Sequence, residues 1–195
     1  RLADGEDKDG NGEITRFILP SPPDIPRTRV EAADHTINIY WSNNSEFTVD
    51  PITKELDFEG YRVYLKQLGF DVTQVPNLAE DLKNIAAFDS VGNNLFFETG
   101  FKSIRLKEPV YFEGDTIPYY YLYKIENIQN GWQYAVSVTA FDRGNEQTNL
   151  EPLESSLLAN TKRVFVGTAP SNDMDVNSPF VYPNPYYYGA SWEGR

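Results

Sequence analysis

Residues Tyr119–Asp142, with the sequence YYYLYKIENIQNGWQYAVSVTAFD, decide the fold that we expect for this chain. Apolar and polar side chains alternate in Tyr119–Ile125 and again in Trp132–Phe141, which is the pattern of two half-buried β-strands. Residues Glu126–Gly131 connect the two runs and contain an Asn-Gly pair, a strong signal for a tight β-turn. The stretch therefore predicts an antiparallel hairpin.

The second of these strands has two chemically different faces. Its apolar face carries Tyr134, Val136, Val138 and Ala140, and its other face carries mostly small or hydroxylic side chains. We expect the apolar face to pack on a core and the other face to meet solvent. Because two strands alone are only marginally stable in water, the rest of the chain must supply an opposing sheet.

The composition supports an all-β fold with one core. The chain has 195 residues, which favours one domain with appended segments over two large domains. Hydrophobic residues make up 40% of it, enough for a core, and its 13 tyrosines favour strands over helices.

The charge and the residue types exclude several classes of function. A formal net charge of −12 argues against a nucleic-acid backbone or an anionic membrane as partner and suits cations. The chain has no cysteine, so thiolate metal sites, disulfides and cysteine nucleophiles are excluded. It has one histidine and none of the common nucleophile, phosphate-binding or zinc motifs, so we expect no enzymatic activity. No apolar run is long enough for membrane insertion.

An acidic segment near the start of the chain matches part of a calcium-binding loop. In Asp7–Ile14, the side chains of Asp7, Asp9 and Asn11 occupy positions 1, 3 and 5 of an EF-hand-type loop, and Glu13 would offer its carbonyl oxygen. The match fails at position 12, where Ile18 replaces the bidentate glutamate. Two interpretations stay open for residues 1–21, a weak Ca²⁺ site that stiffens a junction or a flexible acidic linker.

The main domain is predicted to span residues 22–167. Four prolines in Leu19–Pro26 mark its beginning, because such a run stays extended and cannot lie in a central strand. Further strands are predicted at Arg27–Ala33, Thr36–Ser42, Phe58–Lys66 and Ser155–Val166, with the only histidine, His35, exposed at a turn and Trp41 in the core.

Residues 67–118 are longer than an ordinary strand connection and are predicted to form an insertion. Leu78–Ala86 has the spacing of a short amphipathic helix. Aromatic residues recur through the segment, and two interpretations stay open for them. They cover one edge of the sheet, or Phe96, Phe97 and Phe101 form an exposed platform that binds glycan or protein.

The order of these segments resembles a fibronectin type III domain. The resemblance is carried by INIYW at Ile37–Trp41, EGYRVY at Glu59–Tyr64, and YAVSVTAFD at Tyr134–Asp142 followed by Gly144 and Asn145. It implies an immunoglobulin-like β-sandwich over residues 22–167, with the long insertion between the third strand and the hairpin. It also implies that Tyr134 forms the family's tyrosine corner.

A second resemblance lies at the end of the chain. VYPNPY at Val181–Tyr186, followed by ASWE, is similar to the opening of the C-terminal β-sandwich modules on large secreted proteins of Bacteroidetes-like bacteria, many of which use type IX secretion. Residues 168–195 are then a linker and the first strand of a following module. The triplets that contain Ser90 and Thr116 resemble the O-glycosylation motif of those bacteria, which implies that both residues lie on exposed loops.

These observations predict a non-catalytic extracellular module of a larger secreted or cell-surface protein, which spaces or displays the neighbouring domains of the same polypeptide. The first residue is Arg1 and not methionine, so we expect a piece of something larger. Two alternatives stay open, an accessory module of a secreted hydrolase that binds a glycan or a cell-surface protein, and a surface-filament subunit whose Val181–Tyr188 strand completes a neighbour's sheet.

Overall fold

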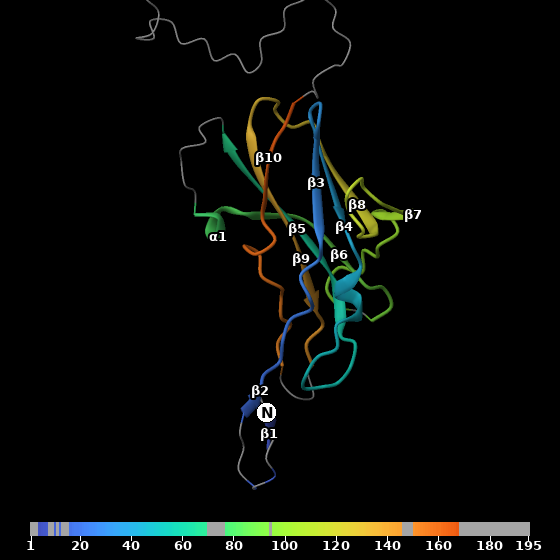
Figure 1. Ribbon diagram of the computed structural model, residues 1–195, viewed down its shortest axis with the longest axis vertical. Helices are drawn as coiled ribbons and strands as arrows, with labels where there is room; N and C mark the ends of the chain where they lie inside the picture. The colour runs from blue at the N-terminus through green and yellow to red at the C-terminus, as the bar shows by residue number, and fades with distance from the viewer. Residues whose placement is uncertain are drawn as a thin grey trace, which may run out of the picture.

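A computed structural model describes residues 4–7, 10, 12, 16–69, 77–93, 95–145 and 150–167. It is a sandwich of two four-stranded antiparallel sheets (Figure 1). The first sheet has the order β3 (Thr28–Ala33), β4 (Thr36–Trp41), β8 (Tyr119–Glu126), β7 (Arg105–Val110). The second has the order β10 (Lys162–Phe165), β9 (Gln133–Asp142), β5 (Phe58–Gly69), β6 (Lys83–Asp89).

Three short elements accompany the sheets. A separate two-stranded hairpin pairs β1 (Asp4–Glu6) with β2 (Arg16–Ile18). The one-turn 3-10 helix η1 (Asn44–Phe47) follows β4, and the one-turn α-helix α1 (Leu78–Asp81) precedes β6. No helix in the described part of the chain is long and apolar enough to cross a membrane.

The core lies between the two sheets and confirms the predicted all-β sandwich. Alternate residues of each inner strand point into it, among them Ile37, Ile39 and Trp41 of β4 and Val136 and Val138 of β9. Trp41 is fully buried and packs its ring against those of Tyr61 and Tyr121. Each large side chain buried in this way contributes about 1.5–3 kcal/mol to folding. The predicted strands around His35 and the predicted core role of Trp41 are therefore confirmed.

The expected hairpin at Tyr119–Asp142 is wrong, although both of its strands exist. β8 pairs with β4 and β7, whereas β9 pairs with β5 and β10, so residues 127–132 cross from one sheet to the other. The alternation of side chains is the same in either arrangement, because both strands bury one face in the shared core. Gly131 has a positive φ of 78° as its turn signal required, but its N–H donates to the carbonyl oxygen of Val166.

The second face of β9 is also buried, which corrects the expectation that it meets solvent. The hydroxyl of Ser137 donates to the carbonyl oxygen of Leu157 at 2.8 Å, and that of Thr139 donates to Glu154 Oε1 at 2.5 Å. The stretch 153–161 therefore lies against this face. Small hydroxylic side chains leave room for a chain to approach closely, and they satisfy its polar groups.

Residues 67–118 supply an edge strand to each sheet. The predicted helix ends at Asp81, and the chain from Lys83 onward joins β5 as β6, so the helix over Leu78–Ala86 is wrong beyond its first turn. Pairing with a long central strand outweighs a weak local helical pattern. The pairing is close: a Cβ atom at Gly60 of β5 would lie 2.2 Å from the carbonyl oxygen of Phe88.

The sandwich has two poles that carry different segments (Figure 1). We call the end with the start of β3 and the described loop residues 42–57, 90–93, 95–104, 143–145 and 150–154 the N-terminal pole. The opposite end, with the Asp34–His35 turn, the crossing loop 127–132 and the end of β10, is the C-terminal pole. The chain therefore enters the sandwich at one pole and leaves it at the other.

Candidate functional site

The loop that follows β6 at the N-terminal pole carries the predicted aromatic binding residues, and the carboxylate of Asp89 organises it. Asp89 is the last residue of β6 and is fully buried. Its Oδ2 accepts hydrogen bonds from the backbone N–H groups of Phe97 (2.6 Å) and Glu98 (2.9 Å), and its Oδ1 accepts from Thr99 N (2.6 Å). Burial alone would raise the pKa of Asp89, but these bonds outweigh it and hold the pKa below its usual value.

Two further carboxylates hold the same loop. Glu59, buried on β5, accepts from the amide of Asn93 with both of its oxygens, at 2.9 and 2.8 Å. Burial raises the pKa of Glu59, and the bond from Asn93 opposes this rise. The Glu98 carboxylate accepts from the backbone N–H groups of Gly92 and Asn93. The loop is thus built around bonds to carboxylates.

These bonds sustain an unusual backbone at the aromatic pair. Phe96 and Glu98 have positive φ values of 51° and 52°, which for residues other than glycine costs on the order of 1–3 kcal/mol each. Phe96 packs its ring edge-on against Phe141 with centroids 5.2 Å apart, and it is 44% exposed. Phe97 is 64% exposed. The loop therefore holds Phe96 on the sandwich and presents Phe97 to solvent.

The third predicted binding residue has a different place. Phe101 is half-buried and packs against the core, with its ring centroid within about 6 Å of those of Phe58, Tyr61 and Tyr121. Phe96, Phe97 and Phe101 consequently do not form one exposed row, and of the three Phe97 is the most exposed.

A small cavity of about 10 Å³ lies at the same pole and is lined by three aspartates, Asp50, Asp57 and Asp142. Asp50 and Asp142 are buried, and each accepts two backbone N–H bonds with its Oδ1: Asp50 from Ile52 and Thr53, Asp142 from Gly144 and Leu153. Burial and the charges of Asp142 and Asp50 raise the pKa of Asp57 to about 6. Within the described residues, no group of three or more His, Asp or Glu side chains is placed to hold a metal ion.

The described residues of the predicted calcium loop, Asp7, Gly10 and Gly12, lie between β1 and β2 in the chain. The carboxylate of Asp7 accepts backbone N–H bonds from Gly10 (2.7 Å) and Gly12 (2.8 Å), and both glycines have positive φ. Asp9, Asn11 and Glu13 lie outside the described residues. The bonds to Asp7 therefore lie within the segment that joins the two strands.

The two predicted glycosylation residues have different surroundings. Thr116 is exposed in the loop between β7 and β8. Ser90 is half-buried, and its hydroxyl donates to the carbonyl oxygen of Glu59 at 3.1 Å. Only Thr116 has the exposure that the resemblance implied. Val181–Tyr188 and the rest of the predicted following strand lie outside the described residues.

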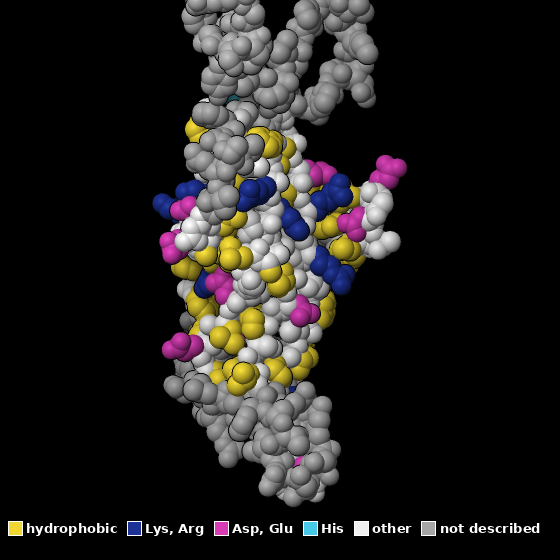
Figure 2. All heavy atoms as spheres, turned by 60° about the vertical axis from the view of Figure 1, so that its left-hand side comes forward, with side chains coloured by type: hydrophobic (Ala, Val, Ile, Leu, Met, Phe, Trp, Pro, Cys, Tyr) yellow, Lys and Arg dark blue, Asp and Glu magenta, His cyan; other side chains and the backbone are white. Residues whose placement is uncertain are grey.

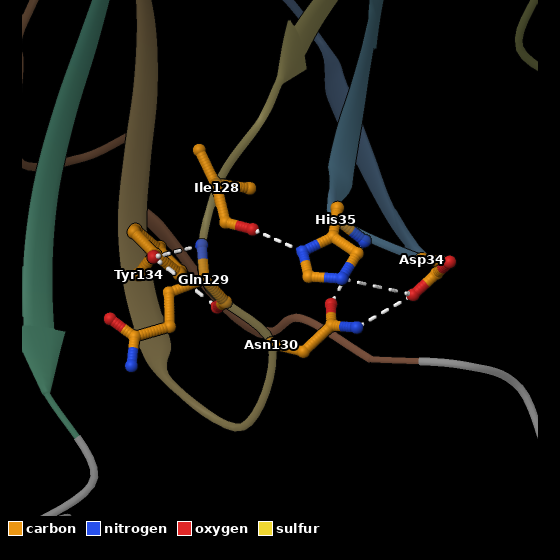
Figure 3. A network of polar contacts seen from close by, with 6 residues as sticks. All are labelled: Asp34, His35, Ile128, Gln129, Asn130 and Tyr134. Atoms are coloured by element: carbon orange, nitrogen blue, oxygen red, sulfur yellow. Dashed lines mark hydrogen bonds and ion pairs between the residues drawn. The ribbon is translucent and has the colours of Figure 1, made fainter.

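At the C-terminal pole a polar network fixes the crossing loop (Figure 3). The hydroxyl of Tyr134 accepts from Gln129 N at 3.0 Å and donates to Gln129 O at 3.3 Å, which closes a ring over the loop. His35 Nδ1 donates to Ile128 O at 2.9 Å, and the Asn130 amide donates to Asp34 Oδ1 at 2.6 Å. His35 is an exposed turn residue, as predicted, and the turn it occupies is bonded to the crossing loop.

The anchors of these loops were not identified from the sequence. Asn93 lies 34 residues from Glu59, and Thr99 lies 10 residues from Asp89. No local motif marks such pairs, because the partners meet only when β5 and β6 align. Positive φ at Phe96 and Glu98 has no local signal either, since aromatic and glutamate side chains disfavour it.

Comparison with protein-family models, with curated protein sequences and with solved structures finds no match for this chain.

Proposed function

We propose that the chain is a non-catalytic module of fibronectin type III type in a larger secreted or cell-surface protein, where it holds neighbouring domains apart. The observation that carries this proposal is the position of the two poles (Figure 1). The first and last strands of the sandwich, β3 and β10, lie near each other, and Asn160 next to β10 donates to Thr28 of β3 at 2.8 Å. A load applied at the two poles would therefore be carried along the whole sandwich.

Two features support the fibronectin type III assignment. The strand neighbours form two antiparallel sheets in which consecutive strands cross between sheets, as in immunoglobulin-like sandwiches. In addition, the hydroxyl of Tyr134 at the start of β9 bonds the backbone five residues upstream, which is the geometry of a tyrosine corner.

A structural role also fits the use of the buried acids. Asp89 and Glu59 hold the loop after β6, and Asp142 holds the turn after β9. Burial raises the pKa values of Glu59 and Asp142, and at Asp89 the hydrogen bonds from the loop outweigh burial and lower the pKa. Each shift thus has a structural cause, as is found for carboxylates outside active sites.

The spacer role is tested by measuring the distance between the poles. Because the chain has no cysteine, Asp24→Cys and Phe165→Cys place one fluorescent label at each pole, both at exposed positions. We expect a narrow distribution of energy-transfer efficiencies that does not change when folded proteins are fused to either end. A broad distribution, or one that shifts with the fused protein, would contradict the spacer role.

Phe97 favours a second candidate function, an accessory binding module. An exposed aromatic ring on a loop that is fixed by hydrogen bonds loses little entropy on binding, and aromatic side chains dominate binding hot spots. On the face shown in Figure 2, hydrophobic side chains are spread among polar ones, so this face offers no continuous apolar plate. Of the three predicted aromatic residues Phe97 is the most exposed, so binding through this loop would be centred on the Phe97 ring.

Screening against arrays of polysaccharides and cell-surface proteins tests this second candidate. We expect a bound array member to lose at least tenfold in affinity with Phe97→Ala and to keep its affinity with Tyr111→Ala, an equally exposed aromatic outside the loop. Equal losses in both variants would contradict a specific role of Phe97.

Calcium at the acidic hairpin is part of the proposed spacer role, since Asp7 lies between its two strands and the chain is strongly acidic. Bound Ca²⁺ would stiffen the junction before the sandwich. Isothermal titration with CaCl₂ should give heat that disappears with Asp7→Asn and persists with Asp24→Asn. Absence of heat at millimolar Ca²⁺ would remove calcium from the proposal.

Secretion and glycosylation rest on the sequence resemblances. Thr116 is exposed, as a modified residue must be, whereas the Ser90 hydroxyl is engaged. Mass spectrometry of the protein from its native host should find a glycan on Thr116. An unmodified Thr116 peptide would contradict this part of the proposal.

A further inference from the structure

One edge of the first sheet is open along half of its length. β7 pairs with β8 only at Tyr119 and Tyr121, and the Leu122 N–H donates to Ile104 O at 2.8 Å. Beyond Leu122, β8 continues for four residues, and in the described structure these pair on the β4 side alone. Backbone groups of a strand alternate in direction, so those of Lys124 and Glu126 point to the same side as those of Leu122. On that side, no strand of the described part of the chain pairs with Lys124 or Glu126.

A cavity of about 370 Å³ lies beside this edge. It is lined by residues from β6, from β8, from the start of β7 and from the turn before β7: Phe88, Ser103, Ile104, Arg105, Leu106, Leu122, Tyr123 and Lys124. The rings of Phe88 and Tyr123 meet edge-on with centroids 5.7 Å apart, and they bridge the open side of the sandwich between β6 and β8. The cavity thus has an apolar floor next to unpaired backbone donors and acceptors.

The charges around the cavity are opposite to the charge of the chain. Both charged residues in its lining, Arg105 and Lys124, are cations, and both are exposed. Neither forms an ion pair within the described part of the chain. In a chain of net charge −12, two neighbouring unpaired cations form a local site for negative charge.

We propose that the open edge of β8 binds an extended acidic peptide segment of a partner protein, which adds to the first sheet in line with β7. The backbone of the segment pairs with Lys124 and Glu126. Alternate side chains pack on Phe88 and Tyr123, and carboxylates lie beside Arg105 and Lys124. The edge from Leu122 to Glu126 spans about 14 Å, which is enough for a segment of about five residues. Strand addition of this kind draws its affinity from main-chain bonds and its specificity from alternate side chains.

This interaction goes beyond the proposed spacer role, because a spacer needs no open edge. The spacer role and the peptide binding are tested separately. Absence of peptide binding would leave the distance between the poles unchanged, and a variable distance between the poles would leave the edge of β8 able to bind.

The probe is the peptide acetyl-Glu-Val-Glu-Val-Glu-Val-Glu-amide, added to the full chain. We expect saturable binding by isothermal titration calorimetry, together with at least tenfold slower amide hydrogen exchange at Lys124 and Glu126. Lys124→Glu should weaken binding tenfold or more. Lys162→Glu on β10, also exposed, is the matched charge reversal and should change affinity less than threefold. Circular dichroism of both variants checks that the fold is intact.

Backbone pairing is separated from charge attraction by two N-methylated probes of equal charge. One carries N-methyl groups on the valines and the other on an equal number of glutamates, so only one of them blocks the N–H groups that face β8. We expect one probe to bind as the parent does and the other to lose at least tenfold. Equal affinity of the two probes, binding without amide protection, or no binding of the parent peptide at 1 mM would each overturn the proposal.

Discussion

At the residue scale, Asp57 illustrates how carboxylates crowded at one pole set the pH dependence of stability. It precedes β5 and lines the small cavity together with Asp50 and Asp142. Burial and its acidic neighbours raise its pKa from 3.8 to about 6. The folded protein therefore binds this proton more tightly than the unfolded chain does, and stability falls as the pH rises from about 4 to 6.

Asp57→Asn should stabilise the protein at pH 7, because it removes the unfavourable charge. A shift of about 2 pKa units corresponds to about 3 kcal/mol at most, and the partial exposure of Asp57 reduces the expected gain to about 1–2 kcal/mol. Urea unfolding at pH 4.5 and pH 7 measures the effect, which should be markedly smaller at the lower pH. Asp24→Asn, at an exposed position, is the control and should change stability by less than about 0.5 kcal/mol. A loss of stability at pH 7 in Asp57→Asn would contradict the raised pKa of Asp57 and the burial and acidic neighbours that cause it.

Tyr134→Phe tests the two hydrogen bonds between the Tyr134 hydroxyl and the backbone of the crossing loop. Its hydroxyl accepts from Gln129 N and donates to Gln129 O, so its removal leaves both backbone groups without this partner. We expect a loss of about 1–3 kcal/mol in the free energy of unfolding. Tyr111→Phe, at an exposed tyrosine, should lower the free energy of unfolding by less than about 0.5 kcal/mol. Equal losses in the two variants would contradict a stabilising role of the Tyr134–Gln129 hydrogen bonds.

Single residues differ in how far the sequence predicts their place. Trp41 is predictable as a core residue because strand alternation and size both point inward. Tyr134 follows from the resemblance and from alternation. Asp89 is not predictable, because a carboxylate at the end of a strand carries no signal that three backbone N–H groups of a later loop will surround it.

At the element scale, Glu154 is one of the residues that join the stretch 153–161 to β9, and it also contacts β5. Glu154 Oε1 accepts from the hydroxyls of Tyr64 (2.7 Å) and Thr139 (2.5 Å), and its Oε2 forms an ion pair with Arg62. The guanidinium of Arg62 also lies over the Phe141 ring at 4.3 Å. These contacts join β5, β9 and the stretch before β10 on the outer face of the second sheet.

Glu154→Gln should loosen this outer face. It removes the charge that pairs with Arg62, and it replaces one acceptor oxygen with a donor, which costs about 1–3 kcal/mol at a half-buried site. Hydrogen exchange should become faster over residues 153–161 while it stays slow in β4. Glu151→Gln, three residues earlier and exposed, is the control. Unchanged exchange in 153–161 would show that other contacts hold this stretch.

Strands are predictable from the sequence where apolar and polar side chains alternate. The neighbouring strands with which they pair are not. Alternation located β3, β4, β5, β8 and β9, but it could not show that β8 and β9 lie in different sheets, since either arrangement buries the same side chains. The helical spacing of Leu78–Ala86 was misleading because it does not reveal that β5 has a free edge. Only the assembled sheet makes Lys83–Asp89 more favourable as a strand.

At the scale of the whole molecule, the sandwich joins two poles with different chemistry. The N-terminal pole gathers buried aspartates and an exposed aromatic loop, and the C-terminal pole is closed by the network around His35 and Tyr134. Between them, β3 and β10 run beside each other and belong to different sheets. Both sheets share one core, so we expect them to unfold together.

Single-molecule stretching of the chain between two reference domains tests the spacer role most directly. The chain should unfold in one step, with a contour-length gain of about 500 Å for residues 22–167. A single step of this size means that the two sheets resist force as one unit. Two or more shorter steps, or extension without a force peak, would contradict a module that holds its neighbours apart.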